Sequence, residues 1–450
     1  MAVINSTQYA GEVNLEYIKI YSSEGVFADI TDIVVSINIF EDIFSTAMTC
    51  NLVVVDNLNL IEKLPIIGQE FVEMKLSTPQ LNETADSVIE KKFVINTIAS
   101  RESISVGAQA YSFELSTQDS IVNRKTRVSK SYTGSISNTV FDILRNELGS
   151  LQDINVEPTL GIRKIVVPNN HPYTIINQLK KEAISKEYGS PHYVFFENKL
   201  GLNFTSLQSL YNEGVRAKLH SGDKDSDISI FLQSTKKEED DPVKQSHMRV
   251  LSHSFNHYND IGINLDKGML GSKLTTHDIF NKKYDVYTRD YFDNFQDFER
   301  IETIGFANPV YNKQLKEDFG NFEDSVLRLH PVTGQDKDEQ YYVDGVAQYD
   351  SARTKDTMLE RDAKVCELNN GNSLNIKMNG NTFLTVGDLI DISIPITGED
   401  HDNEQDEAST SGLYLITQLR HKIAPQQKQH EISMKVYKDC TKKELYTNRT

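Results

Sequence analysis

Two histidines four residues apart, in His253-Ser-Phe-Asn-His257, have the spacing that comes nearest to a metal site. Histidines at positions i and i+4 of a helix bind zinc in metalloproteases, where a glutamate between them is the general base. This segment contains no glutamate, and its surroundings fit a strand or a loop and not a helix. We therefore expect solvent-facing or hydrogen-bonded histidines here, and no metal site.

Two acidic segments resemble calcium-binding sequences only in part. The segment from Asp223 to Asp227 begins like a calcium loop. However, Ile228 stands where the loop needs glycine, and Ser234 stands where a bidentate glutamate would close the site. Residues 398–407 are strongly acidic but lack a turn pattern that would bring their carboxylates together. Both segments are predicted to be solvated loops.

The usual signatures of nucleotide-binding and hydrolase chemistry are missing from the sequence. It contains no G-x-x-x-x-G-K-[ST], no G-x-G-x-x-G and no G-x-S-x-G, the motifs of P-loop, dinucleotide-binding and α/β-hydrolase proteins. The two carboxylates of a glycosidase lie far apart in sequence and leave no such motif, so a glycan hydrolase stays an open alternative. We otherwise predict a protein that is not an enzyme and has no cofactor.

Composition and charge favour a folded, acidic protein of several domains. The 450 residues are 25% charged and 38% hydrophobic, a length that corresponds to about three domains. The net charge of −18 disfavours nonspecific binding of nucleic acid. Cys50, Cys366 and Cys440 are far apart, so neither a disulfide framework nor a metal-binding pair is predicted. Without a signal sequence or a long apolar run, the protein is expected to remain in a reducing cytoplasm and not to bind membranes.

The first 118 residues have the two-residue period of half-buried β-strands. Apolar side chains alternate with polar ones from Ile33 to Ile39, and the pattern returns at Val72, Met74 and Leu76. Antiparallel sheets with one solvated face give this alternation. Residues 1–118 are therefore predicted to form an antiparallel β domain, either a small barrel or a sandwich.

The remaining chain divides into four parts with different patterns. Residues 119–212 carry two amphipathic helical patterns followed by two short strands, which predicts an α+β insert. Residues 213–248 are polar, contain the charge run from Lys236 to Asp241, and are predicted to be a linker or loop. Residues 249–349 predict an irregular β-rich domain, and residues 350–450 predict a helix followed by a second barrel. The predicted fold class is α+β and mainly β.

Two distant parts of the chain share one order of strands and turns. In both, a glycine turn precedes a strand, a long polar loop follows, and another strand completes the set. The matched segments are Ile67-Gly-Gln69 with Val386-Gly-Asp388, Val72–Leu76 with Ile390–Ile394, and Phe93–Ile98 with Tyr414–Leu419. Unrelated antiparallel domains also share alternation and glycine turns, but the common order favours two copies of one barrel. Gly68 and Gly387 are predicted to occupy equivalent turns.

A duplicated barrel is useful in a ring of three chains. Three chains with two similar domains each present six similar faces, although the true symmetry is threefold. Such a ring can bind a sixfold tube on one side and a threefold object on the other. The repeat permits this arrangement without proving it.

The order of elements across nearly the whole chain resembles the hub proteins of contractile tails. These are the baseplate hubs of T-even-like phages, phage late-control proteins and the N-terminal part of type VI secretion spike proteins. The most specific parts are a helix followed by Ser373-Leu-Asn-Ile-Lys-Met-Asn-Gly-Asn-Thr-Phe-Leu-Thr-Val-Gly-Asp388, and Gly412-Leu-Tyr-Leu-Ile416 leading to His421. In the family, a similar stretch opens the second tube-type barrel.

The resemblance implies a homotrimer whose two tube-type barrels per chain form a pseudo-sixfold collar around a channel for DNA. Implied partners are a hexameric tail tube protein, a central spike and other baseplate proteins, with DNA only in passing. Because the sequence ends at Thr450, soon after the second barrel, the spike is expected to be a separate protein. The implied location is the baseplate of a virion tail assembled in the host cytoplasm. No catalytic residues are implied, and the interface residues remain unknown.

Three alternatives stay open. The first is a tail-associated cell-wall glycan hydrolase, and the second is the hub of a bacterial secretion or injection system. The third is a carbohydrate-recognising tail protein, which the absence of Trp mildly disfavours because such proteins expose aromatic platforms.

Overall fold

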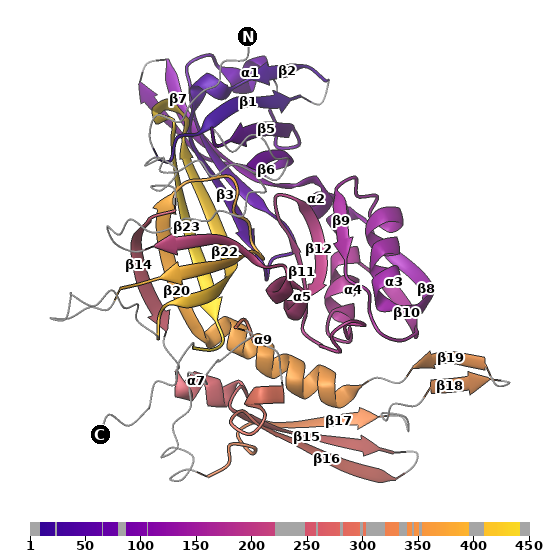
Figure 1. Cartoon of the computed structure of the whole chain (residues 1–450). Coiled ribbons are helices and arrows are strands. Elements are labelled where there is room, and N and C mark those ends of the chain that lie inside the picture. Colours follow the sequence, from indigo (N-terminus) through magenta and orange to yellow (C-terminus); the bar gives the residue numbers. More distant parts are fainter. Residues whose placement is uncertain are drawn as a thin grey trace, which may run out of the picture.

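The computed structural model describes residues 10–22, 25–64, 66–79, 87–105, 107–220, 248–257, 260–279, 282–297, 300–302, 320–332, 340–343, 346–350, 353–395 and 409–441. Strands in these residues form one 13-stranded sheet and four smaller sheets of two or three strands. Figure 1 shows the large sheet beside an α+β lobe, with a third lobe beneath both. The mainly β fold class is confirmed.

The first half of the large sheet contains six antiparallel strands in the spatial order β3-β4-β7-β6-β5-β1. Inward apolar side chains alternate along them, as the two-residue period predicts. The short strand β2 (Phe27–Asp29) continues the edge, and the backbone N–H of Ile30 donates to the carbonyl of Ile18 at 2.9 Å. This hydrogen bond extends the β1–β2 ladder by one residue. The strands are β1 (Asn14–Tyr21), β3 (Val34–Asp42), β4 (Thr49–Asp56), β5 (Phe71–Ser77), β6 (Val88–Ser105) and β7 (Ala108–Thr117).

The second half of the sheet repeats this arrangement strand for strand. Its order is β14-β20-β23-β22-β21-β13, so each strand has the position that its counterpart in chain order has in the first half. One difference is that β13 and β21 are parallel, whereas β1 and β5 are antiparallel. The strands are β13 (Val215–His220), β14 (Val250–His257), β20 (Asn372–Asn379), β21 (Leu389–Ser393), β22 (Gly412–Ala424) and β23 (Gln429–Lys438).

Strand register also agrees between the two halves. Val72 lies opposite Phe93 in the first half, and Ile390 lies opposite Tyr414 in the second. The register then shifts at the same place, because Asn96 interrupts the β6–β7 ladder and Thr417 interrupts the β22–β23 ladder. A bulge changes the twist and direction of its strand. A bulge at the same position in both halves is therefore strong evidence that they repeat one arrangement. The predicted repeat of one β domain is confirmed, except that the second copy contains the parallel pair β13–β21.

An α+β lobe lies between the two halves in sequence. Its strands form the antiparallel pair β8–β10 and a three-stranded sheet in which β12 pairs antiparallel with β11 and parallel with β9. Pro172 begins α4, as expected for a residue with a fixed φ and no N–H. The elements are α2 (Gln118–Lys125), β8 (Val128–Gly134), α3 (Ile136–Asp142), the π-helix η3 (Ile143–Glu147), β9 (Asp153–Val156), β10 (Arg163–Asn170), α4 (Pro172–Leu179), β11 (Tyr193–Glu197), β12 (Gly201–Ser206) and α5 (Leu207–Asn212).

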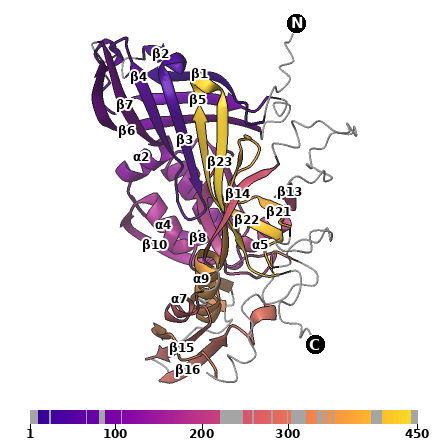
Figure 2. The ribbon, with the colours of Figure 1, turned by 90° about the vertical axis from the view of Figure 1, so that its left-hand side faces the viewer.

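A second insertion separates β14 from β20 and forms the lobe beneath the sheet (Figure 2). Strand β15 pairs antiparallel with β16 and parallel with β17, and β18 forms a hairpin with β19. The helix α9 follows and leads into β20. The elements are α7 (Ile261–Asp266), β15 (Gly271–Asp278), β16 (Lys283–Asp290), the 3-10 helix η4 (Phe295–Asp297), β17 (Leu327–Val332), β18 (Gln340–Val343), β19 (Val346–Asp350), the π-helix η5 (Asp356–Glu360) and α9 (Arg361–Asn370).

The positions of β13 and β14 correct the predicted domain boundaries. Strand β13 starts inside the predicted linker 213–248, and β14 starts inside the predicted domain 249–349, yet both belong to the second barrel. That barrel is therefore assembled from two sections of sequence around an insertion. The charge run and the segment from Asp223 to Asp227 lie outside the described residues, as do residues 398–407.

Strand β22 joins the two halves because it pairs antiparallel with β3, from Gln418 opposite Asp42 to Ile423 opposite Ile37. Leu419 packs in the core of the second half, and Ile423, four residues later, packs in the core of the first. One strand thus belongs to both cores. Figure 2 shows the yellow strands of the second half beside β3. The two barrels therefore share one continuous sheet.

Equivalent turn residues provide a test of this fold. Ile67 precedes Gly68 and is 70% exposed, whereas Val386 precedes Gly387 and is 1% exposed. We expect Val386→Ala to lower the free energy of unfolding by about 2 kcal/mol through lost burial and a cavity, and Ile67→Ala to change it by less than about 0.5 kcal/mol. Urea unfolding of both variants measures this. Equal losses would mean that Ile67 is packed and that the two turns do not differ as described.

Candidate functional site

The two repeat-marking glycines lie in turns of nearly identical backbone conformation. Gly68 has φ +96° and Gly387 has φ +98°, in the left-handed region that glycine enters without steric cost. A carboxylate closes each turn: Glu70 accepts the backbone N–H of Gly68 at 2.8 Å, and Asp388 accepts that of Thr385 at 2.9 Å. The sequence predicted the glycines but not the carboxylates, although an acidic residue follows each glycine within two positions.

The α+β lobe covers the turn at Gly387 and leaves the turn at Gly68 open. Asn198, between β11 and β12, donates its side-chain N–H to the carbonyl of Val386 at 3.3 Å. The neighbouring Lys199 donates its ammonium group to the carbonyls of Thr382 and Phe383, each at 2.6 Å. A lysine that is 6% exposed is costly to bury, and these oxygens replace part of its hydration.

Glu41, at the end of β3, connects the first barrel to the same turn. Its carboxylate accepts the hydroxyl of Thr385 at 2.5 Å and the backbone N–H of Val386 at 3.0 Å. The side chain is 2% exposed, and burial raises the pKa of Glu41. The contact spans more than 300 residues of sequence, so its function is to fix the position of distant segments.

Glu197, at the end of β11, makes the corresponding connection between the α+β lobe and the first barrel. Its carboxylate accepts the backbone N–H of Met48 at 3.2 Å and the hydroxyl of Thr117 at 2.6 Å. Lys91 lies 3.9 Å from it, and burial raises the pKa of Glu197 while it lowers that of Lys91. These groups form a buried polar contact between the α+β lobe and the first barrel.

A histidine pair lies where the two hydrophobic cores meet. The Nδ1 atom of His421 on β22 is 3.0 Å from Nε2 of His430 on β23, and both side chains are buried. Gly380 permits this arrangement, because a Cβ atom there would lie 2.0 Å from the His430 ring. Burial and the neighbouring His430 lower the pKa of His421, which favours the neutral form of its imidazole.

A buried ion cluster fixes the lower lobe to the second barrel. Arg300 contacts both carboxylate oxygens of Glu367 on α9 at 2.8 and 2.9 Å. Lys364 contacts Asp439 at 2.6 Å and Glu367 at 3.1 Å. Although burial opposes ionisation, Arg300 and Lys364 hold the pKa of Glu367 down at about 2. Loss of one partner would leave a buried charge uncompensated, which makes this cluster sensitive to substitution.

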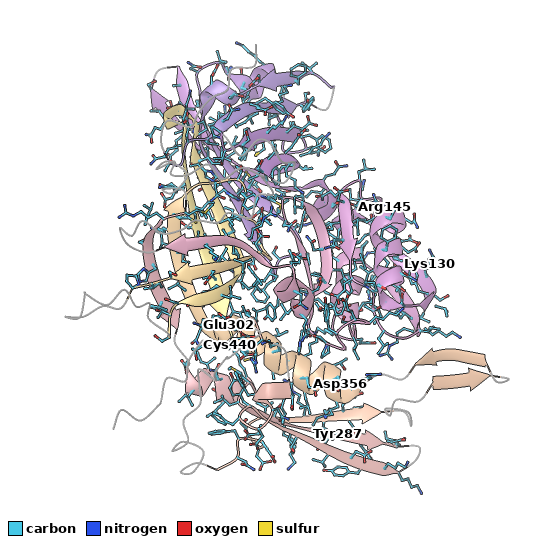
Figure 3. The ribbon with its side chains drawn as sticks, in the orientation of Figure 1. Lys130, Arg145, Tyr287, Glu302, Asp356 and Cys440 are labelled. Carbon is cyan, nitrogen blue, oxygen red and sulfur yellow. The ribbon has the colours of Figure 1, made fainter. Side chains whose placement is uncertain are left out.

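The residues labelled in Figure 3 include both surface ion pairs and groups that connect distant segments of the chain. Lys130 lies on the outside of the α+β lobe, 3.1 Å from Asp142 and 3.0 Å from Glu147. By contrast, Glu302 and Cys440 lie together near the end of the second barrel, where Glu302 accepts the backbone N–H of Leu413 at 3.1 Å. Exposed pairs such as those of Lys130 contribute little to stability.

Within the described residues, those that could have carried chemistry are not assembled into a reacting site. His253 and His257 lie on strand β14, where residues four apart are separated by about 13 Å along the strand. Across the described ranges, no group of three His, Cys, Asp or Glu side chains is placed to hold a metal ion. The three cysteines are buried free thiols. Among the helices that the structure describes, none is long and apolar enough to cross a membrane.

Comparison with known proteins supports the predicted resemblance. No protein-family model matches the chain. A protein of Vibrio phage KVP40 described as "Probable baseplate hub protein gp334" is 22% identical over 381 residues, which are 82% of each chain. Two solved structures have a similar fold, each at 9% identity. The tail protein from Neisseria meningitidis MC58 has a TM-score of 0.52 and is matched over 94% of this chain and 96% of that one.

The second structure is the 43 kDa tail protein of prophage MuSo2 from Shewanella oneidensis. It has a TM-score of 0.50, over 94% of this chain and 98% of that one. The chain therefore has the fold of phage tail proteins and is similar in sequence to a baseplate hub protein. The resemblance to baseplate hub proteins predicted from the sequence is confirmed.

The turn carboxylate Asp388 gives a pH-dependent prediction. Its side chain is 13% exposed, and burial raises its pKa to about 6. Because the folded state holds a proton that the unfolded chain releases near pH 4, stability should fall as pH rises from about 4 to 6. We expect Asp388→Asn to be more stable than the parent at pH 7 by up to about 3 kcal/mol, with no difference near pH 4.

Urea unfolding at several pH values measures this, with the exposed Asp32→Asn as the control variant. A gain for Asp388→Asn that is the same at pH 4 and pH 7 would contradict the account.

Proposed function

We propose that this protein is the structural baseplate hub of a contractile tail. Three chains form a pseudo-sixfold ring that connects the tail tube to the central spike and leaves a channel for DNA. The observation that supports the proposal is the strand-for-strand duplication within one sheet, with shared register and a shared bulge. The similarity to a baseplate hub protein over most of the chain supports the same conclusion.

The duplication supports symmetry matching. A closed ring of three chains presents six similar barrels, so a hexameric tube protein meets six similar surfaces on one side. The inserted lobes differ from one another and obey only the threefold symmetry. They are the proposed contacts for a separate threefold spike and for other baseplate proteins in the virion tail.

Net charge is consistent with a channel through which DNA passes without adhering. Three chains carry an excess of 54 negative charges, three times the 18 of one chain. If part of this charge faces the channel, a passing polyanion is repelled and not bound. Penetration of the host envelope and any lysis then belong to partner proteins.

We propose a role without catalysis. The buried carboxylates Glu41, Glu197 and Glu367 all accept hydrogen bonds that fix distant segments, which is a structural use of these groups. The alternative of a cell-wall glycan hydrolase predicts release of soluble fragments when the purified chain is mixed with peptidoglycan. No release is expected under the proposed function.

Light scattering of the purified chain, alone and with its spike, tests the ring. We expect a mass of three chains at high concentration or in the presence of the spike, whose surface offsets the entropy lost on association. A single-chain mass under all conditions would contradict the proposal. It would leave a two-barrel binding protein, or the secretion-system alternative with a different assembly.

A further inference from the structure

The two copies of the barrel differ in what covers the same turn. Gly68 has φ +96° and Gly387 has φ +98°. The strand after each turn meets its neighbour in the same register, with Val72 and Ile390 at matching positions. Because the backbone of the two turns is equivalent, a difference in their surroundings arises from the inserted lobes and not from the barrel fold.

The α+β lobe covers the turn at Gly387. A Cβ atom on Gly387 would lie 3.3 Å from Phe196 and 3.6 Å from Leu210, and both of these side chains belong to the lobe. Val386, the residue before the glycine, is 1% exposed, and its carbonyl accepts the side-chain N–H of Asn198. The cover therefore consists of apolar side chains over the turn and a hydrogen-bond donor to its carbonyl.

The turn at Gly68 has no such cover among the described residues. Apart from its chain neighbours, none of their atoms lies within 4 Å of the place where a Cβ atom of Gly68 would be, and Ile67 is 70% exposed. The carboxylate of Glu70 accepts the backbone N–H groups of Ile67, Gly68 and Gln69 at 2.7 to 2.9 Å. Since these donors are occupied, a partner would meet the turn through carbonyl oxygens, which only accept hydrogen bonds.

A row of aromatic side chains adjoins this turn on the outer face of the first barrel. Phe71 lies opposite Tyr21, which lies opposite Phe27 on the next strand. Phe27 is 56% exposed, and the ammonium group of Lys92 lies 4.5 Å from the centre of the Phe71 ring. In the second copy, Leu389 occupies the position of Phe71 and is 2% exposed, in the core shared with the α+β lobe. Aromatic side chains are enriched where proteins bind one another.

We infer that the turn at Gly68 and the row from Phe71 to Phe27 form a docking surface for a lobe of a different protein. That lobe presents apolar side chains over Ile67 and Gly68 and amide or ammonium donors to the turn carbonyls, as the α+β lobe does at Gly387. The inference rests on the proposed hub function only in naming this partner as another baseplate protein.

A second copy of this chain is the less suitable partner. Each chain has two turns of this kind but one α+β lobe, whose Phe196, Leu210 and Asn198 already contact the turn at Gly387 of the same chain. The same side chains cannot cover a second turn. A ring of three chains would therefore present three uncovered turns, and three copies of the partner could bind them with threefold symmetry.

Photo-cross-linking of the full chain tests the docking surface. The chain is produced with p-benzoylphenylalanine in place of Ile67, together with the proteins with which it assembles, and the purified assemblies are irradiated. We expect a cross-link to an apolar residue of a different protein, with Asn, Gln, Lys or Arg within three positions, as Asn198 and Lys199 are of Phe196. A cross-link to a second copy, a cross-link to a segment without such donors, or no cross-link would overturn the inference.

The variant Ile67→Asp provides a second measurement. Because Ile67 is exposed in the chain alone, the variant should keep the urea unfolding transition of the parent. It should bind the cross-linked protein at least about tenfold more weakly, since docking would bury a carboxylate without a partner. Val166→Asp, on β10 at 73% exposure, is the matched control and should bind normally. Undiminished binding by Ile67→Asp would overturn the docking surface.

Light scattering of the parent chain, with and without the spike, separates this inference from the proposed ring. A three-chain mass without the expected cross-link would overturn the docking surface and leave the ring intact. A single-chain mass under all conditions, together with the expected cross-link, would overturn the ring and leave the docking surface.

Discussion

Backbone hydrogen bonding between β22 and β3 is the constraint on which the rest of the structure depends. It converts two barrels into one continuous sheet, with Leu419 in one core and Ile423 in the other. A hinge between the barrels would allow their faces to rotate independently, and six equivalent surfaces could not then be maintained around a ring. A shared strand prevents this, because any rotation would break a ladder and expose both cores.

Buried polar groups fix the inserted lobes to this sheet. Glu41, Glu197 and Glu367 each connect segments that are distant in sequence, and each accepts hydrogen bonds from at least two donors, although one carboxylate oxygen of Glu41 has no hydrogen-bond partner among the described residues. Burial of such groups contributes little net stability, but a misplaced lobe would leave a carboxylate unsatisfied. These carboxylates therefore determine where the connected segments lie and contribute little to the free energy of folding. In a hub, correct placement of each lobe determines which partner it meets.

Local patterns in the sequence predicted the local features of the structure, namely its strands and the repeat that they form. Alternation identified the strands, and the match of Val72 and Phe93 with Ile390 and Tyr414 identified the repeat in its correct register. Strands β13 and β14 were missed because an insertion separates them from the rest of their barrel. The donors to Glu41 were equally inaccessible, because nothing near residue 41 indicates a partner at Thr385. Contacts between segments that are far apart in the chain produce no periodic pattern in the sequence from which they could be predicted.

The central claim is that duplication within one sheet produces a ring with six similar positions. End-on electron-microscopy images of the assembled protein with its spike test this most directly. The account predicts a ring of threefold symmetry in which six similar barrel densities surround a channel. A ring with three separate densities, or particles of one chain without a channel, would contradict it.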